Sequence, residues 1–225
     1  MNSIWVIGGG RFGLKAAEKL RLKNPRAAIT VVEKNKNVCS RLDGQSFKVV
    51  CTDGIDYLFE KLNESDGPDW IIPAIPIHVV FEWIRKKLSG NYHLNVLAVS
   101  EQVATALPNP FQGRNGELYI SNADFICPED CPEPAEICTY SGKPRPGILH
   151  KVLKAIRHDV FCSIVVQSCQ LCPGVGGYSP GALFKALDQV VMANAPILLS
   201  TACRCHGVMH AFSLISIKKD ILCLI

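Results

Sequence analysis

Two hydrophobic periods alternate along the first hundred residues of the chain. Residues 4–7 form a short apolar run that ends at a glycine-rich stretch, and Ala16, Ala17 and Leu20 then recur at helical spacing. Residues 28–33 are β-branched and apolar, which is typical of a buried strand. The pattern therefore predicts a strand, a glycine loop, a helix and a second strand in that order.

The same alternation continues beyond the second strand. It predicts strands at 47–51, 69–73 and 95–99, and helices at 54–62 and 78–88. Strands and helices that alternate at these lengths favour a doubly wound, mostly parallel sheet. The predicted fold class is α/β of the Rossmann type, with further strand–helix units in a cysteine-bearing C-terminal extension.

The glycine loop carries the first candidate chemistry. Gly8 allows a sharp turn off the strand, Gly10 lets a pyrophosphate approach bare backbone, and Gly13 lets the helix pack closely on the sheet. Glu33 comes 20 positions after Gly13, at the end of the second strand, where a carboxylate can accept hydrogen bonds from the adenosine ribose. We therefore expect NAD(H) as cofactor, although two nearby lysines leave NADP open.

These motifs resemble the TrkA-N type of NAD-binding domain over about the first 90 to 100 residues. The resemblance rests on the glycine loop, on Glu33, and on residues 52–58 and 69–72. It implies a nucleotide-binding domain of the kind that regulates potassium uptake systems and channels. The triple glycine also resembles the precorrin-2 dehydrogenase domain of siroheme synthases. The chain departs from TrkA-N proteins in having Cys51-Thr52-Asp53 in place of a glycine–aspartate pair, and in showing no TrkA-C-like region.

The resemblance extends the set of predicted nucleotide contacts. It places Asp53 near the adenine end of the cofactor, and Ala74 and Ile75 beside it after the fourth strand. The full predicted set is Gly8, Gly9, Gly10, Arg11, Phe12, Gly13, Glu33, Asp53, Ala74 and Ile75.

The chain has eleven cysteines, which is unusual, and nine of them lie in the second half. One group lies in a proline-rich, acidic segment over 127–138, which predicts a loop. A second group follows predicted strands at 163–166 and 197–200. Because ligands bind at the carboxyl ends of the strands in open α/β sheets, we expect the second group to lie near the nucleotide.

Several kinds of thiol site fit these spacings. Zinc needs four ligands of the Cys and His type, and iron–sulfur clusters also take cysteine thiolates. Cys169 and Cys172 could instead cycle between dithiol and disulfide, which makes them the candidate catalytic residues. The candidate metal or cluster ligands are Cys127, Cys131, Cys138, Cys169, Cys172, Cys203, Cys205 and His206. The plainest alternative is free cysteines packed as small apolar residues, which we prefer for Cys39, Cys51, Cys162 and Cys223. We expect His210 to be structural and His78 to be a capping, surface or hydrogen-bonded core residue.

Composition narrows the class of protein. The chain has 225 residues, of which 48% are hydrophobic, so it can bury a sizeable core. The net charge of +4 is spread along the chain, which argues against nucleic acid as a partner. No apolar run approaches the ~20 residues needed to span a bilayer, and the N-terminus shows no signal peptide. We therefore expect a cytoplasmic protein without membrane insertion.

The sequence predicts two parts of the chain and a class of function. Residues 1–105 form the expected NAD-binding domain, and residues 106–225 form a cysteine-rich α/β portion that could complete the same sheet. The leading hypothesis is an NAD(H)-binding redox protein, an oxidoreductase, whose thiol site adjoins the nucleotide. Its redox partner, a small molecule or a protein, is not identified, and a homodimer stays open. The alternative is a non-catalytic nucleotide sensor.

Overall fold

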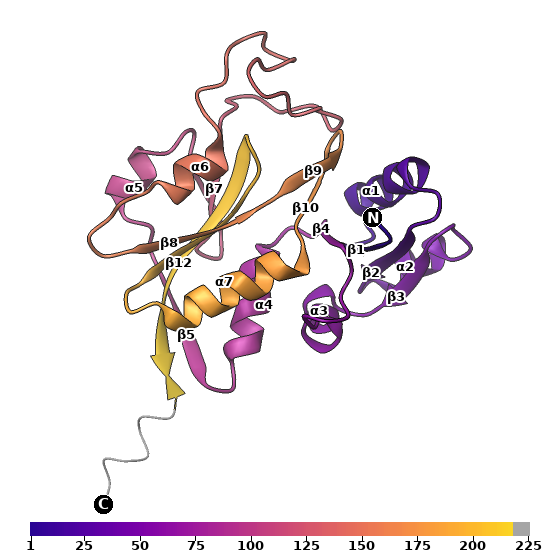
Figure 1. Cartoon of the computed structure of the whole chain (residues 1–225), viewed down its shortest axis with the longest axis horizontal. Helices are drawn as coiled ribbons and strands as arrows, with labels where there is room; N and C mark the ends of the chain where they lie inside the picture. The colour runs from indigo at the N-terminus through magenta and orange to yellow at the C-terminus, as the bar shows by residue number, and fades with distance from the viewer. Residues whose placement is uncertain (218–225) are drawn as a thin grey trace, which may run out of the picture.

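The computed structural model describes residues 1–217 and contains two main sheets flanked by helices (Figure 1). The first sheet has four parallel strands in the order β3-β2-β1-β4. Its central strand buries Ile4, Val6 and Ile7 completely, in agreement with the apolar run that predicts it. The strands are β1 (Ser3–Ile7), β2 (Ala28–Glu33), β3 (Lys48–Cys51) and β4 (Trp70–Pro73).

Three helices connect these strands, namely α1 (Arg11–Lys23), α2 (Lys36–Leu42) and α3 (Gly54–Lys61). Helix α1 buries Ala16, Ala17 and Leu20 against the sheet, as the helical period predicts. Asp53 caps α3, because its carboxylate accepts a hydrogen bond of 2.8 Å from the backbone N–H of Ile55. The α/β class and the Rossmann-type opening of the chain are thus confirmed.

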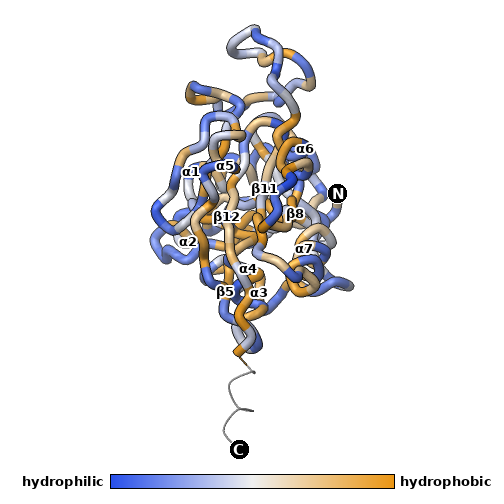
Figure 2. The backbone as a smooth tube through the Cα atoms, turned by 90° about the vertical axis from the view of Figure 1, so that its left-hand side faces the viewer, coloured by the Kyte–Doolittle hydropathy of each residue, from blue (hydrophilic) through white to orange (hydrophobic). Residues whose placement is uncertain are grey.

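The second half builds a separate six-stranded sheet around the long strand β12. Its strands are β5 (Tyr92–Leu97), β6 (Phe111–Gln112), β7 (Leu118–Ser121), β8 (Cys162–Gln167), β11 (Ile197–Ala202) and β12 (His206–Ser216). The order is β6-β7-β12-β11-β8, and β5 also pairs with β12. Only β8 and β11 run parallel to each other in this sheet. Figure 2 shows apolar positions gathered where β8, β11 and β12 lie.

Four helices and a hairpin complete the second half. The helices are α4 (Val79–Leu88), α5 (Glu101–Thr105), α6 (Leu149–Lys154) and α7 (Pro180–Met192). The hairpin consists of β9 (Cys169–Cys172) and β10 (Val175–Gly177). It lies between the first sheet and the second half of the chain (Figure 1). In residues 1–217, no helix combines the length and the apolar character that crossing a membrane requires.

The predicted fifth parallel strand is placed differently. Strand β5 pairs antiparallel with β12 instead of extending the first sheet beyond β4. The edge of β4 is covered by Tyr178, whose backbone exchanges two hydrogen bonds of 2.9 and 3.1 Å with Ile71. The extension therefore does not complete the first sheet. The division at residue 105 stays a prediction, since the strand pairing shows only that the chain changes sheets between β4 and β5.

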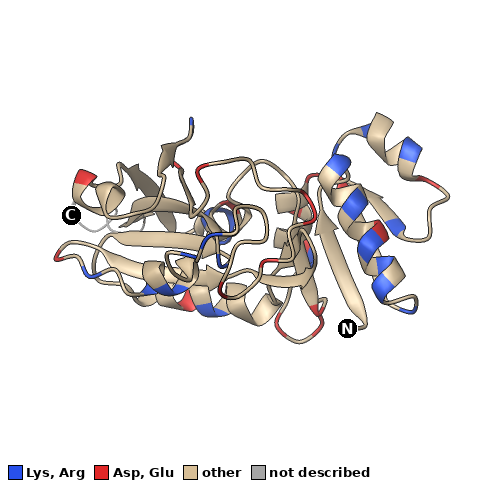
Figure 3. Ribbon diagram, turned by 90° about the horizontal axis from the view of Figure 1, so that it is seen from above, with Lys and Arg blue, Asp and Glu red and all other residues tan. Residues whose placement is uncertain are grey.

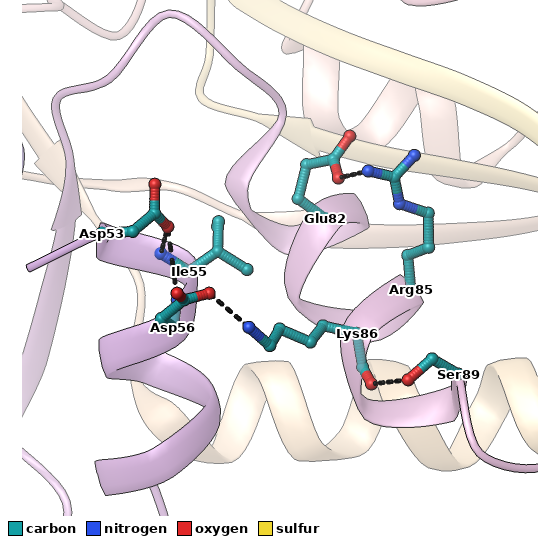
Figure 4. A network of polar contacts seen from close by, with 7 residues as sticks. All are labelled: Asp53, Ile55, Asp56, Glu82, Arg85, Lys86 and Ser89. Atoms are coloured by element: carbon teal, nitrogen blue, oxygen red, sulfur yellow. Dashed lines mark hydrogen bonds and ion pairs between the residues drawn. The ribbon is translucent and has the colours of Figure 1, made fainter.

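Helix α4 joins the two halves. It buries Trp83 and Ile84 in a core shared with Leu58 of α3 and Leu183 of α7. Figure 4 shows the polar side of this contact, where Lys86 of α4 binds a carboxylate of α3. The first sheet and the second half therefore share one hydrophobic core.

Candidate functional site

The loop between β1 and α1 has the backbone geometry that dinucleotide binding requires. Gly8 has a φ of +111°, a conformation that residues with side chains rarely adopt, and its N–H donates to the Val32 carbonyl at 2.7 Å. A side chain at Gly13 would overlap the Gly8 carbonyl oxygen. These two glycines allow the turn and the close packing of the helix against it.

Gly10 differs from the other two glycines because the space beside it is open. No protein atom lies within 4 Å of the position that a Cβ atom would take there. Gly10 is also the N-cap of α1 and provides no side-chain cap, so the first N–H groups of the helix are free to bind an anion. The residues present therefore fit a dinucleotide pyrophosphate at this point.

Glu33 lies against the same loop. One carboxylate oxygen accepts from the Gly9 N–H at 2.7 Å, and the other accepts from the Asn35 N–H at 2.8 Å. Each carboxylate oxygen can accept a further hydrogen bond, so ribose hydroxyls can still bind. The loop thus holds the carboxylate in a fixed orientation beside the expected ribose position.

The remaining predicted contacts surround this loop. The Ala74 N–H donates to the Ile7 carbonyl at 2.8 Å, and Ala74 and Ile75 both lie directly against Gly8. Asp53 caps α3, which gives it a structural role on its own. The roles of these residues in contacting a nucleotide stay predictions.

A cavity of about 780 Å³ lies beside the glycine loop. Phe12 of α1 and Pro73 at the end of β4 form part of its wall, and Phe12 is 60% exposed. Segments from the second half form the rest. They bring several of the predicted metal ligands to the cavity, namely Cys127, Cys131, Cys138, Cys203, Cys205 and His206. One cavity therefore extends from the start of α1 and the end of β4 to most of the clustered cysteines.

Four of these thiols lie close enough to influence one another. Burial raises the pKa of Cys127, and the neighbouring thiols of Cys131 and Cys138 raise it further. Burial also raises the pKa of Cys205. The charge of Arg145 opposes this rise, and the thiols of Cys127 and Cys131 add to it. We call Cys127, Cys131, Cys138 and Cys205 the thiol cluster.

Cys138 has a different environment from the rest of the thiol cluster. Hydrogen bonds from the side chain and backbone of Ser141, and from the backbone of Tyr140, lower the pKa of Cys138. Hydrogen bonds to a thiolate favour the ionised form of a cysteine. Within the thiol cluster, Cys138 is therefore the residue with the most thiolate character.

The predicted metal centre is not supported by this arrangement. Across residues 1–217, no three His, Cys, Asp or Glu side chains gather closely enough to hold a metal ion. Arg145 Nη1 donates a hydrogen bond to Cys205 Sγ, so a guanidinium cation lies among the thiols. Cys203 forms a hydrogen bond with Glu133. Burial, and to a lesser extent this carboxylate, raises the pKa of Cys203 to about 12.

The local structure does not favour the predicted dithiol of Cys169 and Cys172. Both residues lie in the extended strand β9 instead of a turn. Three residues of extended chain span about 10 Å and reverse the side-chain direction, which is too far for a disulfide. Cys169 lines a second cavity of about 380 Å³, whereas Cys172 packs near α1, where Lys19 and Lys23 oppose the rise that burial causes in its pKa. They cannot share one ion either. Cys223, expected to be structural, lies outside the described residues.

A buried pair of histidines borders the cavity. His78 Nδ1 and His210 Nδ1 are 3.0 Å apart, and His78 Nε2 is 2.9 Å from the hydroxyl of Thr201, which lines the cavity. The two rings are 3% and 2% exposed, and His210 stacks on Phe81 with ring centres 3.9 Å apart. Within residues 1–217, no atom lies in hydrogen-bonding geometry with His210 Nε2.

Burial keeps this histidine pair neutral. It lowers the pKa of His210 to about 4, against the opposing effect of Glu117, and together with the neighbouring His210 it holds the pKa of His78 well below the ordinary value. The sequence gives no sign of the pair, because 132 positions separate its members. The only available signal was the position of His78 five residues after β4, at the edge where ligands bind.

Comparison with known proteins agrees with this division of the structure. Residues 4–76 match the TrkA-N domain, and residues 80–215 match AF_1314_C, described as the C-terminal domain of an uncharacterized protein. An uncharacterized protein of Archaeoglobus fulgidus is 30% identical over 218 residues, covering 92% of this chain and 97% of that protein. The chain belongs to the AF_1314_C family. Its AF_1314_C region begins in α4 and ends in β12, so it contains the second sheet and the clustered cysteines.

The TrkA-N match confirms the resemblance inferred from the glycine loop. The first half of this AF_1314_C family member is therefore a Rossmann-type nucleotide-binding domain, and NAD(H) is the kind of nucleotide that such a domain binds.

Proposed function

We propose that the protein is an NAD(H)-dependent oxidoreductase that acts on a small molecule held in the thiol-lined cavity. The observation that supports this most directly is the shared wall of the cavity, which includes Phe12 and Pro73 from the nucleotide half and the thiol cluster from the other half. In Rossmann-type domains the cofactor lies across the carboxyl ends of the strands, where this cavity opens. When bound, the nicotinamide supplies or accepts a hydride.

Arg145 indicates the charge of the small molecule. Its guanidinium lines the cavity and forms no ion pair with a carboxylate among the described residues. Its Nε atom is buried without a hydrogen-bond partner. Arginine binds carboxylates through paired hydrogen bonds, so we propose an anionic substrate that carries a carboxylate.

Thr201 and His78 supply a path for a proton. Hydride transfer to a carbonyl carbon needs a proton at the carbonyl oxygen, and the Thr201 hydroxyl is on the cavity wall. Thr201 Oγ1 can pass its proton to the carbonyl oxygen while it takes one from water in the cavity, and His78 Nε2–H, 2.9 Å away, can orient this hydroxyl while His78 Nδ1 accepts a hydrogen bond from His210 Nδ1–H. Overall, the carbonyl gains a hydride and a proton and becomes an alcohol.

NADH binding and oxidation test this proposal together. We expect the protein to bind NADH, and to oxidise it with at least one member of a panel of 2-oxo acids, aldehydes and quinones. Joint replacement of Cys127→Ser and Cys205→Ser should lower the rate at least about tenfold, since two cavity walls change, and should leave NADH affinity intact. Cys162→Ser, at the exposed start of β8, is the matched control. Equal rates in the double variant and the wild type would remove the thiols from the proposal.

A cysteine-ligated iron–sulfur cluster or zinc ion is the finer part of the proposal. Its support is that the four cysteines of the thiol cluster line one cavity. Such ligands must be thiols instead of disulfides, and a reducing cytoplasm would keep them so. Anaerobic purification followed by metal analysis decides the point. Stoichiometric iron or zinc that is lost in Cys131→Ser supports ligation, whereas metal-free protein that binds NADH normally ends this part of the proposal.

A nucleotide sensor is the second candidate, and the TrkA-N match favours it. In a sensor, nucleotide occupancy alters docking to another protein and no turnover follows. Tight NADH binding without oxidation by any member of the panel would favour this function over the oxidoreductase.

A further inference from the structure

Helix α1 carries four basic side chains at a spacing of four residues, which we call the basic stripe. In Figure 3, Lys and Arg recur along the helix beside the N-terminus. All four side chains bind the second half of the chain. Lys19 donates to the Pro173 carbonyl at 2.9 Å, and Lys23 donates to the Leu171 carbonyl at 2.5 Å. The members of the stripe are Arg11, Lys15, Lys19 and Lys23.

The first two members of the stripe bind one carboxylate. Arg11 and Lys15 both form ion pairs with Glu129, the latter at 2.5 Å. Arg11 is the first residue of α1, directly after the open space at Gly10. The carboxylate of Glu129 therefore lies at the helix end where the pyrophosphate is expected.

Glu129 also lies within the segment that holds the thiol cluster. Cys127 and Cys131 are two residues away on either side. The Cys131 carbonyl accepts from Gln170 Nε2 at 2.7 Å and from the Gly174 N–H at 3.0 Å, which fixes the segment to the β9–β10 hairpin. Glu129 and the cavity-lining Cys127 and Cys131 therefore lie in one short segment, so a movement of Glu129 would move part of the cavity wall.

The two anions compete for the same cations. A pyrophosphate carries negative charge, so it attracts Arg11 and Lys15 and repels Glu129. The ion pairs are exposed, since the side chains of Arg11, Lys15 and Glu129 are 67%, 51% and 35% exposed. Exposed ion pairs of this kind contribute little stability, so a bound nucleotide can replace them.

We propose that Glu129 is a latch that nucleotide binding releases. With the nucleotide site empty, Glu129 binds Arg11 and Lys15 and holds the segment from Cys127 to Cys131 against α1. Nucleotide binding frees Glu129, and the segment from Cys127 to Cys131 then moves away from α1 and opens the cavity. This inference rests on the proposed NAD(H) binding and adds its regulation, because linkage requires that opening of the cavity and nucleotide affinity favour each other.

Glu129→Gln tests the competition. Removing one negative charge beside the pyrophosphate should tighten NADH binding about threefold to tenfold, measured by fluorescence titration at low salt. Asp130→Asn is the matched control, because it removes the same charge from the next residue, which forms no ion pair in the part of the chain that the structure describes. Affinity that is unchanged or weaker in Glu129→Gln would overturn the latch.

Thiol accessibility tests the opening. Alkylation by iodoacetamide, followed residue by residue with mass spectrometry, should become at least about fivefold faster at Cys127 and Cys131 when NADH is saturating. Glu129→Gln should show the faster rate without NADH, whereas Cys162 should react equally in all samples. Rates at Cys127 and Cys131 that stay constant or fall when NADH is bound would overturn the latch while leaving NAD(H) binding intact. Absence of NADH binding in the wild type and in both variants would overturn the proposed function, and the latch with it.

Discussion

Individual residues explain both the precision of the loop and the properties of the buried histidine pair. Gly8 is required because its backbone has a positive φ, and Gly13 is required because it lies directly against the Gly8 carbonyl oxygen. Both requirements arise within a few residues of chain, so a sequence motif can reveal them. The contact between His78 and His210 depends on how two distant elements pack. For this reason the motif predicts the glycines, whereas sequence reasoning assigned neither histidine to a site and missed their contact with the cavity wall.

The histidine pair predicts a loss of stability in acid. Burial depresses the folded-state pKa of both histidines, so the folded protein keeps them neutral while the unfolded chain protonates near the ordinary value of 6.5. Stability from the pair is complete above about pH 6.5 and is lost as pH falls toward about 4. Between about pH 7.5 and pH 5 we expect the free energy of unfolding to fall by about 2 kcal/mol for His210 alone.

Urea unfolding at the two pH values measures this effect. Glu117 and Arg85 face His210, and hydrogen bonds such as that from the Asn115 N–H hold the pKa of Glu117 below its ordinary value of 4.5 against the effect of burial, so Glu117 contributes little to the difference. His210→Asn removes one titrating ring and should show a smaller loss between the two pH values. Equal acid sensitivity in wild type and variant would mean that the pair is already charged when folded.

At the scale of elements, local signals predict helices better than they predict partners. The caps at Asn35 and Asp53 and the apolar stripe of α1 determine where helices form, and all are visible in the sequence. Strand β5 is predicted as a strand, but its partner is not. The edge of β4 is occupied by Tyr178, which is at least 105 residues further along the chain, and β5 pairs with β12. The C-x2-C motif likewise gives no sign that β9 is extended, because a strand there depends on pairing with β10.

The cap of α3 gives a prediction at this scale. Asp53→Ala removes the hydrogen bonds to the backbone N–H groups of Ile55 and Asp56, and should lower the free energy of unfolding by about 1 kcal/mol. Asp66→Ala, in the exposed loop before β4, is the control. Unfolding in urea without nucleotide separates this structural role from any contact with adenine. A stability equal to that of the wild type would show that α3 does not depend on its cap.

At the scale of the whole molecule, the structure brings a nucleotide-binding half and a cysteine-bearing half to one cavity. Helix α1 is central to this arrangement, because one face packs on the first sheet while its basic stripe binds the cysteine segment and the hairpin. The sequence predicts that the two sites share an edge, since both follow strand ends. It does not predict the second sheet. In that sheet β12 pairs antiparallel with β7, and this pairing positions the part of the cavity wall that contains Cys205 and His206.

The central claim is that a dinucleotide pyrophosphate binds bare backbone at Gly10. Gly10→Val tests it most directly, because the backbone there is extended, with φ of −67°, and no atom of the described residues lies within 4 Å of the position of the new Cβ atom. Gly90→Val, at another open glycine, is the control. We predict that NADH titration shows at least about tenfold weaker binding for Gly10→Val, with an unchanged unfolding temperature, because the side chain fills the space of the pyrophosphate. NADH affinity in Gly10→Val equal to that of the wild type would contradict the account.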